Sequence, residues 1–248
     1  MNMPSSSKAL FYSSDERSLF LLRLDEFYSR VTGPSMMIIS LDKQLEVLDI
    51  EGDSHLSYTL LIPAGTPVTI KTNRAKVAIC FLKSTGSDVK KLIPLMANHI
   101  KIDGQYTLSS KVRYEKLIRE QAKEVWQDTP KASDVLRLLE KSINAFDGLH
   151  DKTINYEADA RVVKVIDMIK ENCTVNVSVG DMAKAVGLSV ARLSQLFRAT
   201  TGTSIRNFRL WERVFYTVRC LQSGMSLTDA AVMAGFSDYA QCFRAYKE

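Results

Sequence analysis

The sequence predicts an α+β protein in which a β-rich N-terminal domain precedes an all-helical C-terminal domain. Two observations predict it. Short apolar runs of period 2, separated by turn formers, fill residues 1–85, and the period becomes helical after Asp88. We expect a small β-barrel or sandwich over 1–85, a helical segment over 86–147, a linker over 148–159 and an all-α domain over 160–248. A chain of 248 residues is long enough to form two cores.

The strands of the first domain are predicted from alternation. HLSYTLLI (55–62) places Leu56, Tyr58, Leu60 and Ile62 on one face of a strand. Shorter apolar runs are MMIIS (36–40), PVTIK (67–71) and VAICFL (77–82), and turn formers separate them at 32–34, 51–53, 63–65 and 72–73.

Two amphipathic helices are predicted between the domains. Apolar residues recur at helical spacing over 112–126 and again over 130–147, where Thr129 and Pro130 form a typical helix start. These helices could pack on the β domain or form the seam of a homodimer, and the pattern favours neither. DGLHDKTINYE (147–157) is typical of a linker.

The excess of positive over negative charge lies in the C-terminal part of the chain. Residues 161–248 carry 12 Lys/Arg and 7 Asp/Glu, whereas residues 1–160 carry 21 of each. Such asymmetry indicates a neutral domain followed by one that meets a polyanion. The four cysteines show no CxxC pairing, no apolar run could span a bilayer, and the N-terminus has no secretory signal pattern. We therefore expect a cytoplasmic protein that binds no membrane.

A helix-turn-helix pattern lies at 181–202. A short helix with Ala183 is followed by a turn at Gly187, a cap at Ser189 and a second helix that buries Leu193 and Phe197. The outward residues of the second helix suit base contacts, since Gln pairs with adenine and Arg with guanine or phosphate. These outward residues are Ala191, Arg192, Ser194, Gln195 and Arg198.

The same pattern recurs 48 residues later. SLTDAAVMAGFSDYAQCFRAYK (226–247) again runs from a cap through an Ala-rich helix to a glycine turn at Gly235 and a basic helix. One long helix over 204–223 separates the two units, with Ser204 as its N-cap and Gly224 just past its end. Predicted phosphate contacts are Ser189, Arg206, Arg209, Arg213 and Ser237.

The C-terminal 88 residues resemble the AraC/XylS family of bacterial transcription regulators. The matching stretches are MAKAVGLSVARLSQLFRATTGTS, FRLWERV and SLTDAAVMAGFSD followed by Arg244. The resemblance implies a double helix-turn-helix domain whose two recognition helices read adjacent major grooves of double-stranded DNA. It implies base-reading roles for Ala191, Arg192, Ser194 and Gln195 on the first helix. On the second helix the corresponding residues are Tyr239, Ala240, Gln241 and Arg244.

The second unit departs from the family pattern. Cys242 stands where a larger core residue is usual, and Phe243 where a polar outward residue is usual. The tail that usually follows this helix is absent. We therefore expect the first unit to dominate specificity. An exposed Phe243 also motivates an alternative, a protein-interaction regulator in which only the first unit reads DNA.

The resemblance further implies a cupin-like N-terminal domain that senses an effector, and helices that dimerise. A pocket could be formed by Tyr58, Leu60, Ile70 and Phe81, although such residues are more often core. The three histidines are too dispersed for a metal site, and no nucleophile or phosphate-binding loop is found, so we expect no cofactor and no enzymatic activity. The expected partners are DNA, a second copy of the chain, a small-molecule effector and RNA polymerase.

Overall fold

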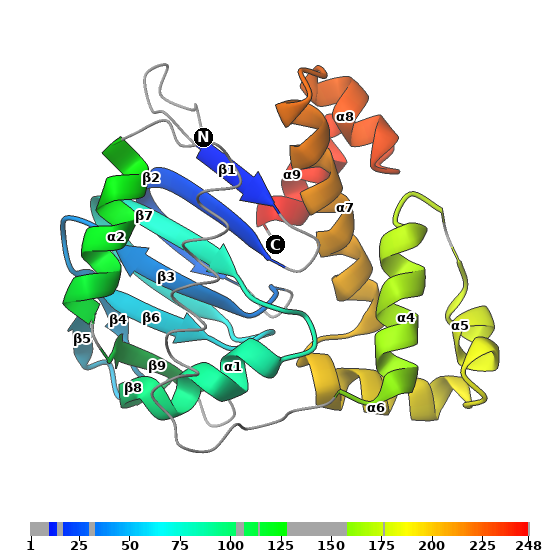
Figure 1. Cartoon of the computed structure of the whole chain (residues 1–248), viewed down its shortest axis with the longest axis horizontal. Coiled ribbons are helices and arrows are strands. Elements are labelled where there is room, and N and C mark those ends of the chain that lie inside the picture. The colour runs from blue at the N-terminus through cyan, green and yellow to red at the C-terminus, as the bar shows by residue number, and fades with distance from the viewer. Residues whose placement is uncertain are drawn as a thin grey trace.

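The computed structural model describes residues 10–13, 17–29, 33–102, 107–113, 115–127, 158–175 and 177–247. A β-barrel is followed by a helical domain that lies against it (Figure 1). The strands are β1 (Leu10–Ser13), β2 (Ser18–Ser29), β3 (Met36–Ser40), β4 (Leu45–Leu48), β5 (Ser54–Ser57), β6 (Thr59–Ile62), β7 (Val68–Phe81), β8 (Met96–Lys101) and β9 (Thr107–Val112).

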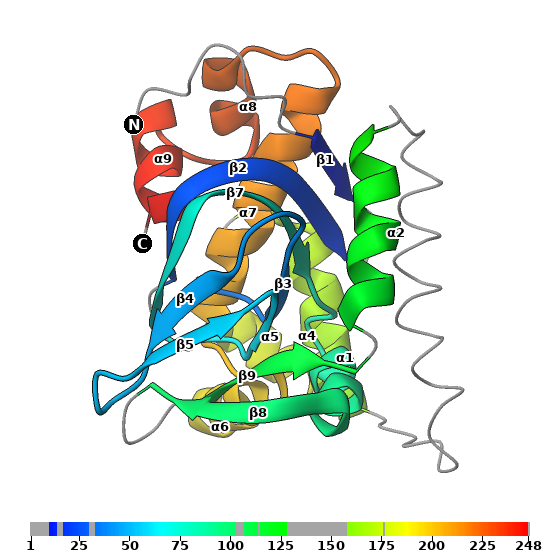
Figure 2. The same ribbon diagram turned by 90° about the vertical axis from the view of Figure 1, so that its left-hand side faces the viewer.

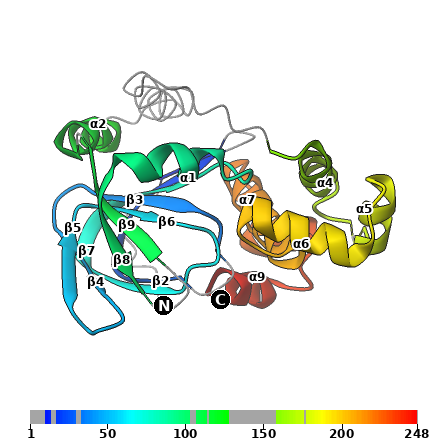
Figure 3. The ribbon, with the colours of Figure 1, turned by 90° about the horizontal axis from the view of Figure 1, so that it is seen from below.

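The sheet is antiparallel and nearly closed. Its order is β1-β2-β7-β3-β6-β9-β8, and β4 pairs with both β5 and β7. The strands curve round a common interior, as the views from the side and from below show (Figures 2 and 3). This interior is packed with aliphatic side chains that include Ile38, Leu60 and Ile70, so it is a core.

Two strand predictions were wrong in detail. The runs 67–71 and 77–82 belong to the single strand β7, and the turn expected at Thr72-Asn73 is a bend within it. Asn73 and Arg74 have φ of 51° and 58° at the point where the register with β2 shifts. Such an irregularity bends a strand without ending it, which lets β7 wrap round the barrel.

The strand expected over 55–62 is instead two strands, β5 and β6, with a break at Tyr58. The Ser57 hydroxyl causes the break, because it accepts from the backbone N–H of Thr59 (3.2 Å) and donates to its carbonyl (2.8 Å). Leu56 is consequently 52% exposed on the hairpin, whereas Leu60 is fully buried.

The β domain extends beyond the boundary expected at residue 85. Strands β8 and β9 lie within the segment expected to be helical, and β9 completes the sheet beside β6. Helix α1 (Ser87–Leu92) and the 3-10 turn η1 (Ile93–Leu95) precede them, and α2 (Glu115–Gln127) follows. Helix α2 confirms the helix expected over 112–126. The second helix and the linker fall on 128–157, outside the described residues, so the dimer seam stays a prediction.

Both α1 and α2 cover the outer face of the barrel, where a second apolar cluster forms. The Arg17 guanidinium clamps α1 to the start of β2 through two bonds to the Asp88 carboxylate, 2.8 and 2.9 Å long. Thr59 donates to Glu115 of α2 at 2.6 Å.

The helical domain contains α4 (Ala160–Glu171), α5 (Val179–Ala185), α6 (Val190–Thr201), α7 (Ile205–Gln222), α8 (Leu227–Met233) and α9 (Tyr239–Lys247). The expected caps are confirmed at Ser189 and Ser204, whose side chains accept from backbone N–H groups of the first turn. Gly187 and Gly235 have φ of 66° and 83°, as the tight turns of both units require. Among the described residues, none of the helices has the length and apolarity needed to cross a membrane.

Helix α7 runs between the barrel and α4 and closes the open end of the barrel (Figure 1). Its Phe215 joins the interior cluster of the barrel, and Trp211 packs against the same cluster. Phe81 of β7 meets both rings, with centroids 5.7 Å from Trp211 and 5.1 Å from Phe215.

A second contact joins the barrel to the end of α6. A Cβ on Gly202 would lie 3.0 Å from the Cβ of Ala64, and one on Gly86 would lie 3.0 Å from the carbonyl of Thr200. Both glycines have positive φ, so their conformation and their close approach each favour glycine.

Candidate DNA-binding surface and interdomain pocket

The first helix-turn-helix unit consists of α5, the turn at Gly187 and α6, supported by α4. Leu193 and Phe197 of α6 are fully buried with Val162 and Ile166 of α4. The opposite face of α6 is exposed, as expected, and it carries Ala191, Arg192, Ser194, Gln195 and Arg198.

Two of the predicted base readers on α6 are bonded to each other. Arg192 donates from Nη1 to Oε1 of Gln195 at 2.9 Å, which holds the two side chains together one turn apart. The Ser194 hydroxyl donates to the carbonyl of Val190 at 2.8 Å. Arg192 and Gln195 therefore form the polar pair that this helix presents.

The N-terminus of α4 adds a charged pair that the sequence analysis did not single out. Asp159 caps α4 and accepts from the Arg161 guanidinium at 2.7 and 3.0 Å. Its hydrogen bonds to Arg161 and, more weakly, the charge of Arg192 lower the pKa of Asp159 to about 2. Asp159 thus stays ionised near Arg192. The two residues are 33 positions apart in the sequence, so sequence patterns alone do not show that they are close.

The second unit consists of α8, the turn at Gly235 and α9. Ala231 and Ala234 are fully buried against α7, and their small side chains permit the close crossing. Cys242 is buried, and its Sγ lies 3.8 Å from the Thr217 hydroxyl of α7. The small side chain at position 242 therefore packs directly on α7.

Helix α9 begins at a side-chain cap. Asp238 caps the helix, because its Oδ1 accepts from the backbone N–H of Gln241 at 2.7 Å. The Gln241 side chain turns back and accepts from the Ser237 backbone N–H at 2.8 Å. Gln241 is therefore engaged in a reciprocal cap similar to a capping box.

Tyr239 (54% exposed) and Arg244 lie on the surface of α9, and Ala240 is half-buried. The side chain of Phe243 is outside the described part of the structure, so its outward position stays a prediction.

Two of the predicted phosphate contacts on α7 are used inside the domain. Arg209 donates to the carbonyls of Val177 (2.8 Å) and Val175 (3.2 Å), and Arg213 donates to the carbonyl of Cys173 (2.9 Å). These carbonyls belong to the connection between α4 and α5. Arg209 and Arg213 lie about one helical turn apart on α7, and both guanidinium groups bind this connection.

Arg206, one turn earlier on α7, is exposed, as are Ser189 and Ser237. The α4–α5 connection also meets the second unit, since a Cβ on Gly235 would lie 3.1 Å from the carbonyl of Thr174. The connection therefore joins the two units through α7.

The effector pocket predicted inside the barrel was wrong. Leu60 and Ile70 are fully buried in the core, and Tyr58 lies outside it beneath the guanidinium of Arg119, 3.4 Å from its ring centroid. Phe81, also in the predicted set, lines a pocket at another place in the structure. The prediction failed because strand alternation does not distinguish a cavity from a packed interior.

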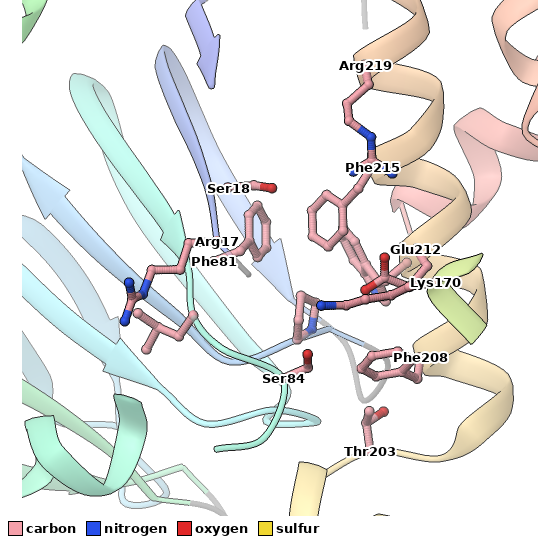
Figure 4. A pocket seen from close by; sticks show the side chains of 13 residues that line it. Arg17, Ser18, Phe81, Ser84, Lys170, Thr203, Phe208, Glu212, Phe215 and Arg219 are labelled. Atoms are coloured by element: carbon pink, nitrogen blue, oxygen red, sulfur yellow. The ribbon is translucent and has the colours of Figure 1, made fainter. Parts of the chain in front are cut away.

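The pocket lies instead between the barrel and the helical domain (Figure 4). One wall is aromatic, Pro34 and Leu82 are further apolar residues of the lining, and the remaining residues are polar or charged. The aromatic residues are Phe81, Phe208, Trp211 and Phe215, and the polar ones are Arg17, Ser18, Ser84, Lys170, Thr203, Glu212 and Arg219.

Two buried polar atoms of this lining lack a hydrogen-bond partner within the described part of the chain. They are the indole Nε1 of Trp211 and the hydroxyl oxygen of Thr203. Because an unpaired buried donor costs about 1–3 kcal/mol, native structures contain few of them. Both atoms belong to residues that line the pocket.

The charged side chains of the pocket differ in their surroundings. Arg17 is bound to Asp88. Burial raises the pKa of Glu212, and the charges of Lys170 and Arg219 oppose that rise without cancelling it.

Comparisons with known proteins agree with this architecture. Residues 182–248 match a protein family described as a helix-turn-helix domain. No curated protein sequence matches the chain significantly. The expected AraC-type helix-turn-helix domain at the C-terminus is thereby confirmed, and it supports a DNA-binding transcription regulator.

Solved structures of ToxT from Vibrio cholerae share the fold of nearly the whole chain. An apo form of ToxT with one substitution has 11% identity and a TM-score of 0.63, over 95% of this chain and 94% of that one. ToxT bound to an unsaturated fatty acid has 13% identity and a TM-score of 0.55, over 100% and 93%. ToxT bound to (E)-4-(8-methylnaphthalen-1-yl)but-3-enoic acid has 10% identity and a TM-score of 0.55, over 98% and 94%. The expected fold, an N-terminal β-barrel followed by a helical domain, is thus confirmed.

Replacing Arg213 separates its structural role from a phosphate contact. We expect Arg213→Ala to lower the free energy of unfolding by about 1–3 kcal/mol, because a buried carbonyl loses a charged donor. The salt dependence of DNA binding should stay unchanged. Urea denaturation and DNA titrations at several salt concentrations measure the two effects.

Arg206→Ala is the matched control and should behave in the opposite way. Stability should be unchanged, and the slope of log K against log salt should fall by about one. If Arg213→Ala lowered the slope without lowering stability, the structural assignment of Arg213 would be wrong.

Proposed function

We propose that the chain is a sequence-specific DNA-binding transcription regulator that places α6 and α9 in adjacent major grooves. The observation that carries this is the single helix between the two units. Helix α7 has 18 residues, which at about 1.5 Å per residue gives a length of about 27 Å. Successive major-groove segments on one face of DNA lie about 34 Å apart. A straight helix of this length is a suitable spacer for two recognition helices.

Arg192 and Gln195 are the main base readers in this proposal. They are exposed, they belong to one helix face, and their mutual hydrogen bond orders both side chains before DNA arrives. Preordered side chains lose less conformational entropy on binding. Arg198 and Arg206 are exposed cations suited to phosphate contacts.

The second unit contributes less specificity. Gln241 would have to break its bond to the Ser237 backbone before it could reach a base, which leaves Tyr239 and Arg244 as readers on α9. The same observation favours the alternative regulator in which only the first unit reads DNA. Contacts with RNA polymerase and dimerisation remain expectations from the sequence.

A carboxylate effector in the interdomain pocket completes the proposal. Two ToxT structures hold carboxylic acids, an unsaturated fatty acid and a naphthyl-butenoic acid. In this chain the pocket combines an aromatic wall, the cations Lys170 and Arg219, and the unpaired donor of Trp211. An amphiphilic acid matches this lining, with its apolar part against the rings and its carboxylate at the cations.

Gln195→Ala tests the reading of DNA. We expect loss of preference at one base pair, worth about 1–3 kcal/mol, because a bidentate side-chain contact is removed. Selection of binding sites from a random DNA pool measures it. Gln222→Ala, the same change at the exposed end of α7, should leave the selected site unaltered. An unchanged site for Gln195→Ala would refute the role of Gln195.

Lys170→Met tests the effector site. The probe is the naphthyl-butenoic acid, and the signal is the heat of binding measured by calorimetry. We expect Kd for the probe to rise at least about tenfold, because hydrogen bonds to charged groups contribute about 1.5–3 kcal/mol. Lys184→Met, on the exposed face of α5, should bind like the wild type. Equal affinity for the two variants would contradict binding at this pocket.

A further inference from the structure

Glu212 is the one carboxylate among the pocket residues described above, and it lies on the face of α7 that closes the barrel. Phe208 precedes it by four residues and Phe215 follows it by three, so all three side chains share one helix face. Figure 4 shows the Glu212 carboxyl and the Lys170 amine directed into the same space. A carboxylate effector seated at the cations would therefore approach a second carboxylate.

Charged groups reach Glu212 from the helices packed around it. Lys170 of α4 and Arg219 of α7 attract its negative charge. Cys173 lies in the α4–α5 connection. Burial is the main cause that raises the pKa of its thiol, and the negative charge of Glu212 raises it further.

On the barrel side of the pocket, the positive charge of Arg17 is neutralised by the carboxylate of Asp88. Arg17 lines the pocket, but its guanidinium makes two bonds to Asp88, at 2.8 and 2.9 Å. Lys170 and Arg219 are therefore the cations whose charge acts on Glu212, and they are also the cations proposed to bind the effector.

Even without an effector, Glu212 gains a proton more readily than an exposed glutamate does. Burial raises the pKa of Glu212 although both cations oppose the rise. An arriving carboxylate would share those cations with Glu212 and place a second negative charge beside it. Two carboxylates in such a site cannot both ionise without a large cost, so one of them holds a proton.

We propose that the pocket takes up its carboxylate effector together with one proton, which is held between the effector and Glu212. This rests on the effector function proposed above. The bound state contains one proton and one net negative charge on the pair of carboxyl groups. Effector binding then weakens as pH rises, because the free protein and the free acid must gain that proton from increasingly dilute hydrogen ions.

Calorimetry on the full chain tests the coupling, with the naphthyl-butenoic acid as probe. Titration in two buffers of different ionisation enthalpy counts the protons taken up. Between about pH 6.5 and 8.5 we expect uptake approaching one proton per ligand, with Kd rising by up to about tenfold per pH unit. Glu212→Gln should take up almost no proton and should bind with a Kd that varies less than about twofold over this range.

Glu171→Gln, the same substitution on an exposed carboxyl of α4, is the matched control and should take up protons like the wild type. Binding to the wild type without proton uptake would overturn the coupling and leave the effector function standing. Uptake that persists in Glu212→Gln would also overturn it. The number of protons that the wild type takes up per ligand tests the coupling even if Glu212→Gln fails to fold. If the probe fails to bind the wild type at any pH, both the effector function and the coupling are contradicted.

Discussion

The closure of the barrel by α7 is the contact on which the rest of the structure depends. The rings of Phe81, Trp211 and Phe215 form a triad with centroids 5.1–5.8 Å apart across the domain boundary. Aromatic pairs at these distances contribute about 0.5–1.5 kcal/mol each beyond the area they bury. One helix therefore completes the core of the barrel, forms a wall of the pocket and separates the two DNA-binding units.

The same helix fixes the units to one another. Arg209 and Arg213 bind carbonyls of the α4–α5 connection, and Gly235 of the second unit meets that connection at Thr174. The first unit is also held to the barrel through the close approach of Gly202 to Ala64. A ligand that changed the distance between Phe81 and Trp211 would act on the element that positions both recognition helices.

The repeated helix-turn-helix units could be predicted from the sequence because their signals are local. Glycine turns at Gly187 and Gly235 and caps at Ser189 and Ser204 depend on residues within one turn. The roles of Arg209 and Arg213 could not be predicted, because periodicity places them on a polar face without showing what covers it. Long-range packing decides between a carbonyl partner and a phosphate.

The barrel was harder to predict for related reasons. Strand β9 contains TLSSKV and lacks a clear apolar alternation, so its place in the sheet depends on pairing with β6. The pocket escaped prediction because it arises between Phe81 and residues of α4 and α7, more than 80 positions away. Strand residues such as Leu60 and Ile70 have the same apolar character whether they line a cavity or fill a core.

Footprinting of the full chain on its selected DNA site tests most directly whether α7 holds two recognition helices in adjacent grooves. The account predicts two protected major-groove segments on one face of the DNA, about one helical turn or 10 base pairs apart. Protection of a single segment would contradict it and would favour a regulator in which only the first unit reads DNA.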